Sequence, residues 1–168
     1  MVAAALVLYG AVLFVNAFFL LGRAEGKAVG PVNAIVGGIG VVIGLYTAAA
    51  NLLGPASGFV AALVMIFGIT FLIFAAMVMG ALDGRAVGWY ALFGSIACLL
   101  WGWGFFTTYR SLSNGVFCLI WAGVFALFAA NLAFARPWAR ITAYAAMFTS
   151  FATLLLPGYL LLMGASLP

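Results

Sequence analysis

Polar side chains are scarce in the long apolar stretches of this chain, so Asn16, Thr70 and Asn131 are candidates for binding a solute. Each side chain can donate and accept hydrogen bonds without carrying charge. In an apolar medium such groups either bond to a neighbouring helix or line a path through the protein. For any one of the three residues, the sequence leaves both interpretations open.

Bulky apolar residues recur close to these polar positions as three pairs, with four residues from one member to the next. Residues four apart lie on one face of a helix, so three such pairs facing a common axis would form two stacked rings. With 16 phenylalanines in the chain, the pattern can also arise by chance, but the nearby polar residues favour a pore. The pairs are Tyr9 and Leu13 before Lys27, Phe67 and Phe71 before Arg85, and Trp121 and Phe125 before Arg140, at closely matched distances.

The elements that carry these residues follow from the charges, which are only eight in 168 residues and gather into short clusters. About 20 helical residues cross a hydrocarbon core roughly 30 Å thick, and most uncharged stretches have about that length. The stretch 28–82 is long enough for two spans, because segment 51–58 contains Asn51, Gly54, Pro55 and Gly58 and predicts a turn. We therefore predict an all-α integral membrane protein of six spans, at approximately 2–22, 29–51, 58–81, 87–107, 114–135 and 141–163.

Lysine and arginine are concentrated in the first, third and fifth predicted loops, and Arg110 is the exception. Cytoplasmic loops are enriched in these residues, so we predict that these three loops are cytoplasmic and that the N and C termini lie outside. Each of these loops leads into an even-numbered span, which indicates three helical hairpins. The net charge of +4 is explained as loop charge, and no nucleic-acid partner is expected.

A hydrophobic fraction of 69% excludes a soluble domain, and the predicted loops are too short for a separate one, so residues 1–168 are predicted to form one transmembrane domain. The first span has no basic segment before it and is long enough to remain in the membrane, so we do not expect a cleaved leader. Cys98 and Cys118 fall within predicted spans and are expected to pack as small apolar residues. No metal site and no cofactor are expected.

The residue types argue against catalysis and against ion coupling. The chain has no histidine, and its only carboxylates, Glu25 and Asp83, lie in predicted loops. Intramembrane enzymes need a nucleophile with a base or a metal, and coupled transporters usually hold an ionisable group at membrane depth. An anion would lose its hydration against apolar walls at a cost on the order of tens of kcal/mol, against roughly a few for a small neutral solute. We therefore predict passive permeation, and aromatic walls favour planar amides over polyols.

Short segments along the whole chain follow one another in a specific order and spacing. They are Leu8-Tyr9-Gly10 with Leu13 and Asn16, segments 32–38 (VNAIVGG), 67–72 (FGITFL), 82–85 (LDGR) and 88–93 (GWYALF), Ile120-Trp121, and Leu156-Pro157-Gly158. Each segment is weak alone, but together they resemble the AmiS/UreI family of amide transporters and urea channels.

The resemblance implies a protomer of six helices in three hairpins, a conducting path through each protomer, and a homo-hexamer in a bacterial inner (plasma) membrane. It places the aromatic and aliphatic filter of the family on the same helical faces as the residue pattern. The filter falls on Leu13, Phe67, Phe71, Trp121 and Phe125 with Asn16 beside it; Tyr9 and Thr70 complete the predicted pore lining, and Asn131 and Thr149 are secondary candidates.

The chain departs from the acid-gated urea channels that it resembles. Those channels carry a long outward loop with histidines after span two and a carboxylate in span six, whereas this chain has the short turn 54–58 and Thr149. Acid gating is therefore not expected. Cys118 stands where the family has the third aromatic residue of its span-five series, and Phe125 and Phe71 replace a tryptophan and a tyrosine of the family. These replacements favour less polar amides such as acetamide, with formamide and urea as further candidates.

Taken together, the sequence predicts a passive channel for small neutral amides, embedded in membrane lipid, that supplies a cytoplasmic amidase or urease. The alternative is a proton- or ion-coupled secondary transporter of short-chain amides, whose uptake would stop when the gradient is dissipated. A non-conducting membrane scaffold is the third interpretation.

Overall fold

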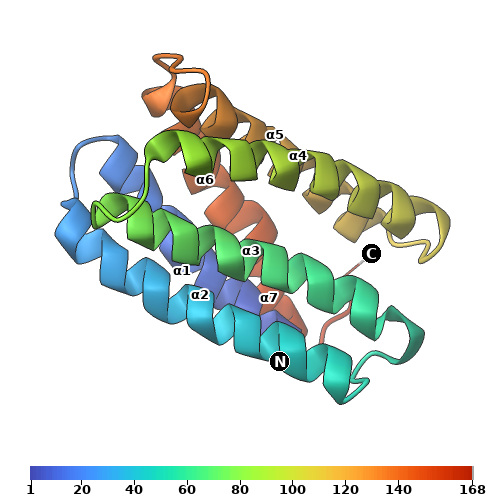
Figure 1. The fold of residues 1–168 in the computed structure, drawn as a ribbon. Coiled ribbons are helices and arrows are strands. Elements are labelled where there is room, and N and C mark those ends of the chain that lie inside the picture. The colour runs from blue at the N-terminus through green and yellow to red at the C-terminus, as the bar shows by residue number, and fades with distance from the viewer. Residues whose placement is uncertain (168) are drawn as a thin grey trace.

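The computed structural model describes residues 1–167, which contain six helices long and apolar enough to cross a membrane and no β-strand (Figure 1). The predicted all-α membrane protein with six spans is confirmed. The first five spans are α1 (Val2–Leu20), α2 (Gly26–Ala49), α3 (Ser57–Val78), preceded by the 3₁₀ turn η1 (Gly54–Ala56), α4 (Gly84–Thr107) and α5 (Leu112–Leu132). The sixth span consists of α6 (Ala139–Thr149), the π-helix η2 (Ser150–Leu155) and α7 (Leu156–Leu162).

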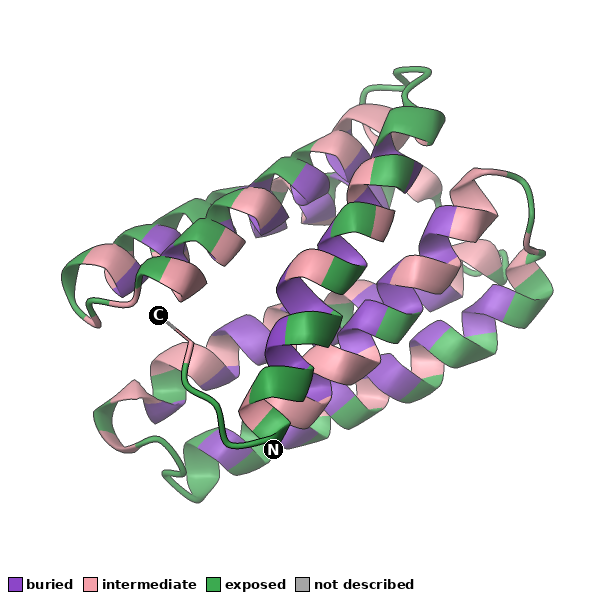
Figure 2. Ribbon diagram, turned by 180° about the vertical axis from the view of Figure 1, so that it is seen from behind, coloured by how far each residue is buried: buried purple, intermediate pink, exposed green. Residues whose placement is uncertain are grey.

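The surface of the bundle is apolar. Ile35, Val42 and Leu100 are each more than 60% exposed, although they lie in the middle of their helices. A helix on the surface of a water-soluble protein would carry polar residues on that face. Figure 2 shows the buried stretches of each helix turned toward the centre of the bundle and the exposed stretches turned outward. The outer faces are therefore suited to lipid or to another protein chain in the membrane.

The helices pack most extensively as α2 with α3, as α4 with α5, and as α1 with the sixth span. The first two pairs are visible side by side in Figure 1. The predicted hairpins, joined by the basic loops, would instead pair α1 with α2, α3 with α4 and α5 with the sixth span. Those helices do touch, but less extensively, so the predicted hairpin repeat is not confirmed.

Small residues explain the closest of these contacts. A Cβ atom added to Gly37 of α2 would lie 2.7 Å from the carbonyl oxygen of Gly68 in α3, and one added to Gly68 would lie 2.9 Å from the carbonyl oxygen of Gly37. Any side chain at either position would push the two helices apart. Membrane helices commonly use small residues in this way, because burial of apolar surface does not drive their association in lipid.

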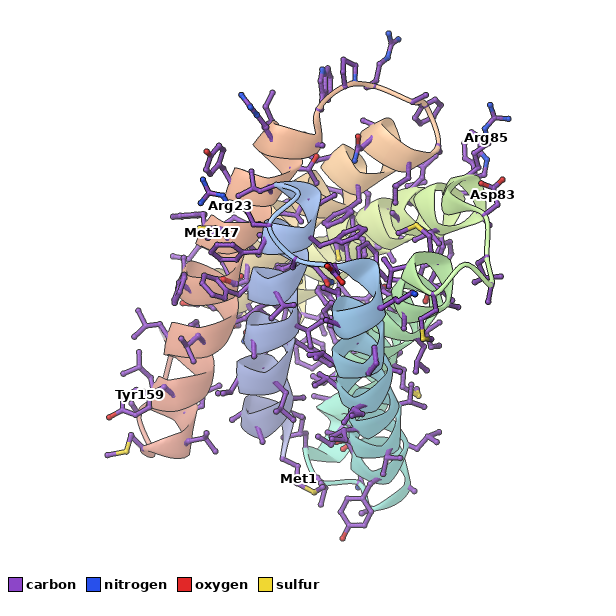
Figure 3. All side chains as sticks on the ribbon, turned by 90° about the vertical axis from the view of Figure 1, so that its left-hand side faces the viewer. Met1, Arg23, Asp83, Arg85, Met147 and Tyr159 are labelled. Atoms are coloured by element: carbon purple, nitrogen blue, oxygen red, sulfur yellow. The ribbon has the colours of Figure 1, made fainter. Side chains whose placement is uncertain are left out.

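All charged residues except Arg110 lie at one end of the bundle. Figure 3 places Arg23, Asp83 and Arg85 at this end and Met1 at the opposite end. The α5–α6 loop, which contains Arg136, also lies here, because each span reverses the direction of the one before. We call this the basic end. The opposite end holds Met1, the turn before α3 and Arg110.

The sixth span is interrupted near its middle by η2. Pro157 has no backbone N–H, so it cannot donate to the carbonyl one helical turn earlier, and the wider turn of a π-helix accommodates that break. The interruption packs against Gly10 of α1, where an added Cβ atom would lie 2.9 Å from the carbonyl oxygen of Ser150. Thr149 is the last residue of α6, immediately before this segment.

Candidate functional site

Two cavities follow one another between the helices. The wide cavity has a volume of about 570 Å³ and is lined at the Met1 end by residues including Met1, Leu6 and Tyr9. The narrow cavity has a volume of about 40 Å³ and lies farther toward the basic end. Phe67 and Trp121 line both cavities, and no other residue in the range 1–167 does. These two side chains therefore separate the wide cavity from the narrow one.

Three layers of side chains from α1, α3 and α5 surround the two cavities. Within each helix the residues follow a spacing of four and then three, which places them on one face. The first layer borders the wide cavity, and the second and third layers line the narrow cavity. The layers are Tyr9, Phe67 and Trp121; Leu13, Phe71 and Phe125; and Asn16, Phe74 and Phe128.

Phe67 is at the centre of the aromatic contacts. Its ring centroid lies 5.1 Å from that of Trp121 and 5.2 Å from that of Phe125, both edge to face, and it stacks on Tyr9 at 5.9 Å. All four side chains are buried. Such geometries are the favoured ones for aromatic pairs, so the constriction between the cavities is a packed structure and not a loose gap.

The indole of Trp121 is fixed by the sixth span. Its Nε1–H donates to Thr153 Oγ1 at 2.8 Å, and the Thr153 hydroxyl donates to the Thr149 carbonyl oxygen at 2.9 Å. The phenol of Tyr9 is fixed in the same manner, since its hydroxyl donates to the Val64 carbonyl oxygen at 2.8 Å. The indole N–H of Trp121 and the hydroxyl of Tyr9 are thus both hydrogen-bonded within the protein. Only the ring faces of these two side chains are left to contact a solute.

Asn16 both lines the narrow cavity and joins two helices. Its Nδ2 donates to Asn33 Oδ1 at 2.9 Å, and Asn33 Nδ2 donates back to Asn16 Oδ1 at 2.7 Å. Asn33 Nδ2 also donates to the Val29 carbonyl oxygen at 3.0 Å. Asn16 is therefore both a residue that lines the narrow cavity and a partner in a hydrogen bond between two helices. Both asparagines are buried, which makes this amide pair an internal element of the bundle.

The remaining predicted polar residues differ in their surroundings. Thr70 lines the narrow cavity, and its hydroxyl donates to the Ile66 carbonyl oxygen at 2.7 Å. Thr149 also lines the narrow cavity and is 1% exposed, but its Oγ1 has no hydrogen-bond partner. Asn131 is half-buried and lines neither cavity. The structure therefore brings every predicted pore residue except Asn131 to one of the two cavities.

The sequence reasoning did not select Phe74 and Phe128, which line the narrow cavity and meet edge to face at 6.1 Å. They lie seven residues after Phe67 and Trp121, so an extension of the same pattern by one more turn would have found them. Val87 and Ala91 of α4 also line the narrow cavity. These two small apolar residues carry no signal that separates them from the rest of an apolar span.

The chain matches known proteins over almost its whole length. Residues 1–165 match the model of a family described as AmiS/UreI family transporter. A protein of Mycolicibacterium smegmatis, named as a candidate transporter of amidate substrates, is 35% identical over 67% of this chain and 53% of its own length. A protein of Rhodococcus erythropolis, named as the candidate transporter AmiS2, is 31% identical over 92% of this chain and 76% of its own length.

Two solved structures share the fold. The closed-state cryo-EM structure of the Helicobacter pylori urea channel has a TM-score of 0.86, and the crystal structure of the urea channel of the same organism has a TM-score of 0.85. They cover 97% and 98% of this chain, respectively, and each match spans 98% of the channel at 22% identity. The resemblance noted in the sequence is confirmed, and because the matched family consists of transporters, so is the prediction that the chain is not an enzyme.

Proposed function

We propose that this chain, which belongs to the AmiS/UreI family of transporters, is a passive channel for small neutral amides. The observation that carries the proposal is the lining of the route: no charged side chain lines either cavity, and the narrow cavity is bounded by aromatic and aliphatic groups with Asn16, Thr70 and Thr149 among them. A route of this composition lowers the barrier for uncharged molecules much more than for ions.

The energies separate the two kinds of solute clearly. Moving an ion from water into an apolar interior costs on the order of 20 kcal/mol in an idealised dielectric estimate. A neutral amide loses roughly 2–7 kcal/mol when it is stripped of water without compensation, and a few hydrogen bonds offset much of that. The narrow cavity is therefore selective against charge without any charged group of its own.

The volume of the narrow cavity indicates the size of the solute. One water molecule requires about 10–15 Å³ of cavity volume, so the narrow cavity of about 40 Å³ accommodates a molecule of roughly three or four non-hydrogen atoms. Formamide, acetamide and urea have this size. The flat faces of Phe67, Phe71 and Phe125 suit their planar shape. The names of the relatives, which refer to amidate substrates and to urea channels, support the same solute class.

Passive movement is favoured over coupling to an ion gradient. A coupled carrier usually holds a carboxylate, a histidine or a basic side chain at membrane depth, and no such side chain lines the two cavities in residues 1–167. The chain also has no histidine to sense acid between pH 5 and pH 7. The channel therefore follows the solute gradient, and a cytoplasmic amidase or urease that consumes the solute would maintain inward flow.

The charges support an orientation with the basic end in the cytoplasm and both termini outside. The family resemblance supports the further proposal of a bacterial inner-membrane protein formed by a single transmembrane domain. The apolar outer faces of the helices allow the chain to contact lipid and to assemble as a homo-oligomer, with the hexamer proposed from the family resemblance.

Proteoliposomes that contain the purified protein test this function. We expect them to equilibrate acetamide, formamide or urea faster than empty liposomes, to exclude acetate, and to conduct equally with or without a proton or sodium gradient. Loss of uptake when the gradient is dissipated would identify a coupled transporter instead. Permeability equal to that of empty liposomes for every amide would identify a non-conducting scaffold.

A further inference from the structure

The wide cavity is much larger than the proposed permeant requires. Its volume of about 570 Å³ falls within the roughly 300–1,000 Å³ of sites that enclose drug-sized ligands, whereas the narrow cavity has only about 40 Å³. Leu52 and Leu53 line the wide cavity from the turn before α3 and are each 44% exposed, so the cavity reaches the protein surface at the Met1 end. A cavity of this size and position can bind a molecule larger than the permeant.

Most of the lining of the wide cavity is apolar, and two of its polar groups are already engaged. The Tyr9 hydroxyl and the indole N–H of Trp121 are both hydrogen-bonded within the protein. Among the described lining residues, the remaining polar side chains are Asn114 of α5 and Ser166. Asn114 Nδ2 donates to Ser111 Oγ at 2.9 Å, and by count its amide keeps one N–H and the carbonyl oxygen for a further partner.

The free amide and the aromatic rings lie along one face of α5. Asn114, Phe117 and Trp121 follow a spacing of three and then four residues, and all three line the wide cavity. At 1.5 Å of rise per residue, the seven residues from Asn114 to Trp121 span about 10 Å. Asn114 lies near the start of α5, and Trp121 separates the wide cavity from the narrow one. The cavity therefore offers an amide at its outer end and aromatic rings at its inner end.

We propose that the wide cavity binds primary amides that carry an aromatic ring on a short alkyl chain, and that such a ligand blocks the channel. The amide of the ligand pairs with Asn114 through two reciprocal hydrogen bonds, the arrangement that Asn16 and Asn33 form at 2.9 and 2.7 Å. The ring packs against Phe117 and Trp121, since aromatic groups attract one another edge to face. Binding does not depend on the function proposed above, and the block rests on it.

The size of the ring keeps this ligand in the wide cavity. A benzene ring has six non-hydrogen atoms, more than the roughly three or four that the narrow cavity accommodates. Phe67 and Trp121 are both buried, and their ring centroids lie 5.1 Å apart in an edge-to-face contact. A second ring cannot pass between side chains packed in this way unless they move. The bound ligand therefore occupies the outer part of the route without entering the inner part.

The length of the cavity predicts the best alkyl chain. Each buried methylene group strengthens binding about fourfold, which corresponds to about 0.8 kcal/mol. Affinity should therefore rise from 2-phenylacetamide through 3-phenylpropanamide to 4-phenylbutanamide, which is about 10 Å long from standard bond lengths. It should rise no further for 8-phenyloctanamide, which exceeds the span from Asn114 to Trp121.

Equilibrium dialysis of 4-phenylbutanamide against the purified protein in nanodiscs measures binding without any flux. Protein-free nanodiscs of the same lipid correct for partition into the bilayer. Asn114→Leu removes the polar partner and should weaken binding about tenfold. Asn131→Leu is the matched control, because Asn131 is also a half-buried asparagine of α5 but lines neither cavity. Its affinity should stay within about twofold of the wild type.

Val60→Trp is a second, independent variant. Val60 is half-buried on α3 and lines the wide cavity, so a larger side chain there fills part of the volume and should weaken binding about tenfold or more. Thermal unfolding shows whether each variant is folded. Should Asn114→Leu fail to fold, Val60→Trp and the series of chain lengths on the wild type keep the site testable.

Stopped-flow swelling of proteoliposomes with acetamide tests the block. Saturating 4-phenylbutanamide should lower the acetamide permeability of the wild type by more than about tenfold. The concentration that gives half of this effect should be about tenfold higher for Asn114→Leu and unchanged for Asn131→Leu. Saturable binding to a conducting protein whose acetamide permeability stays the same would overturn the block.

The remaining outcomes separate the site from the channel function. Absence of saturable binding above that of protein-free nanodiscs, for instance because a lipid chain fills the cavity, would overturn the site. Binding that neither Asn114→Leu nor Val60→Trp weakens would overturn its placement in the wide cavity. A protein that binds the ligand but conducts no amide would overturn the channel function and leave the site intact.

Discussion

The wide and narrow cavities differ in size and in the way their polar groups are used. The wide cavity is more than ten times larger and is lined by aliphatic residues, aromatic residues and the polar Asn114 and Ser166. The narrow cavity is lined by the second and third layers and by Thr149, among others. If the proposed channel function is correct, we expect the wide cavity to admit many small solutes and the narrow cavity to select among them.

The largest effect on this difference is expected when one of the two side chains that separate the cavities is removed. Trp121→Ala should join them, raise permeability to amides larger than acetamide by more than about tenfold, and reduce stability by about 3–5 kcal/mol. Stopped-flow swelling with acetamide and butyramide, together with thermal unfolding in detergent, measures both effects.

Trp103→Ala is a suitable control, because Trp103 is 70% exposed on the outside of α4 and touches neither cavity. Its amide selectivity should equal that of the wild type. If Trp121→Ala also kept the wild-type ratio of butyramide to acetamide, the indole would not form part of the size filter. The same comparison with Phe125→Ala tests the second layer.

A second prediction concerns the amide pair beside the narrow cavity. Asn16→Leu leaves the amide of Asn33 buried with only its bond to Val29, and a buried polar group that loses its partner costs about 1–3 kcal/mol. Asn33→Leu should cost a similar amount. The double variant should be more stable than the sum of the two single effects predicts, because no unpaired amide remains.

Unfolding of the two single variants and the double variant completes a double-mutant cycle. A coupling energy close to zero would show that the two asparagines do not depend on each other in the membrane protein.

A third prediction concerns the wide cavity, and its expected effect on stability is smaller. Tyr9→Phe removes the hydrogen bond from the phenol to the Val64 carbonyl oxygen and keeps the ring that stacks on Phe67. We expect a loss of about 0.5–1.5 kcal/mol in stability and no change in the ratio of acetamide to urea permeability. A change in that ratio would mean that the wide cavity also contributes to selection.

The smallest expected effect is that of pH, because neither cavity is lined by an ionisable side chain that titrates between pH 5 and pH 7. Acetamide permeability of proteoliposomes should differ by less than about twofold between these two values. The measurement needs an impermeant buffer on both sides of the membrane. A steep activation at pH 5 would contradict the absence of acid gating and would require a titrating group outside the cavities.

The residues that point to the route could be recognised from spacing alone. Tyr9, Phe67 and Trp121 recur at matched distances from basic loops, and the structure places them in one layer. The predicted pairs end at Phe71 and Phe125, one helical turn before Phe74 and Phe128, so the last two residues were not selected. Helical periodicity identifies a face of a helix but does not tell how far along that face a cavity extends.

The partners of the polar residues required the tertiary structure. Asn33 belonged only to a family-like segment in the sequence, yet it forms the amide pair with Asn16. Thr149 was a secondary candidate among other hydroxyl residues, and only the fold shows that its hydroxyl alone among the helical threonines in residues 1–167 lacks a partner. Asn131 carried the same signal as Asn16 and lies away from both cavities.

The sequence by itself determined six apolar spans, the cluster of charges at one end and the family, because these depend on hydrophobic length, composition and ordered short segments. Only the tertiary structure decided that α2 packs on α3, α4 on α5 and α1 on the sixth span, since lateral contacts depend on where glycines allow two backbones to approach. It also decided which polar groups are paired and which remain free, because hydrogen bonds between helices join residues that the linear order keeps apart.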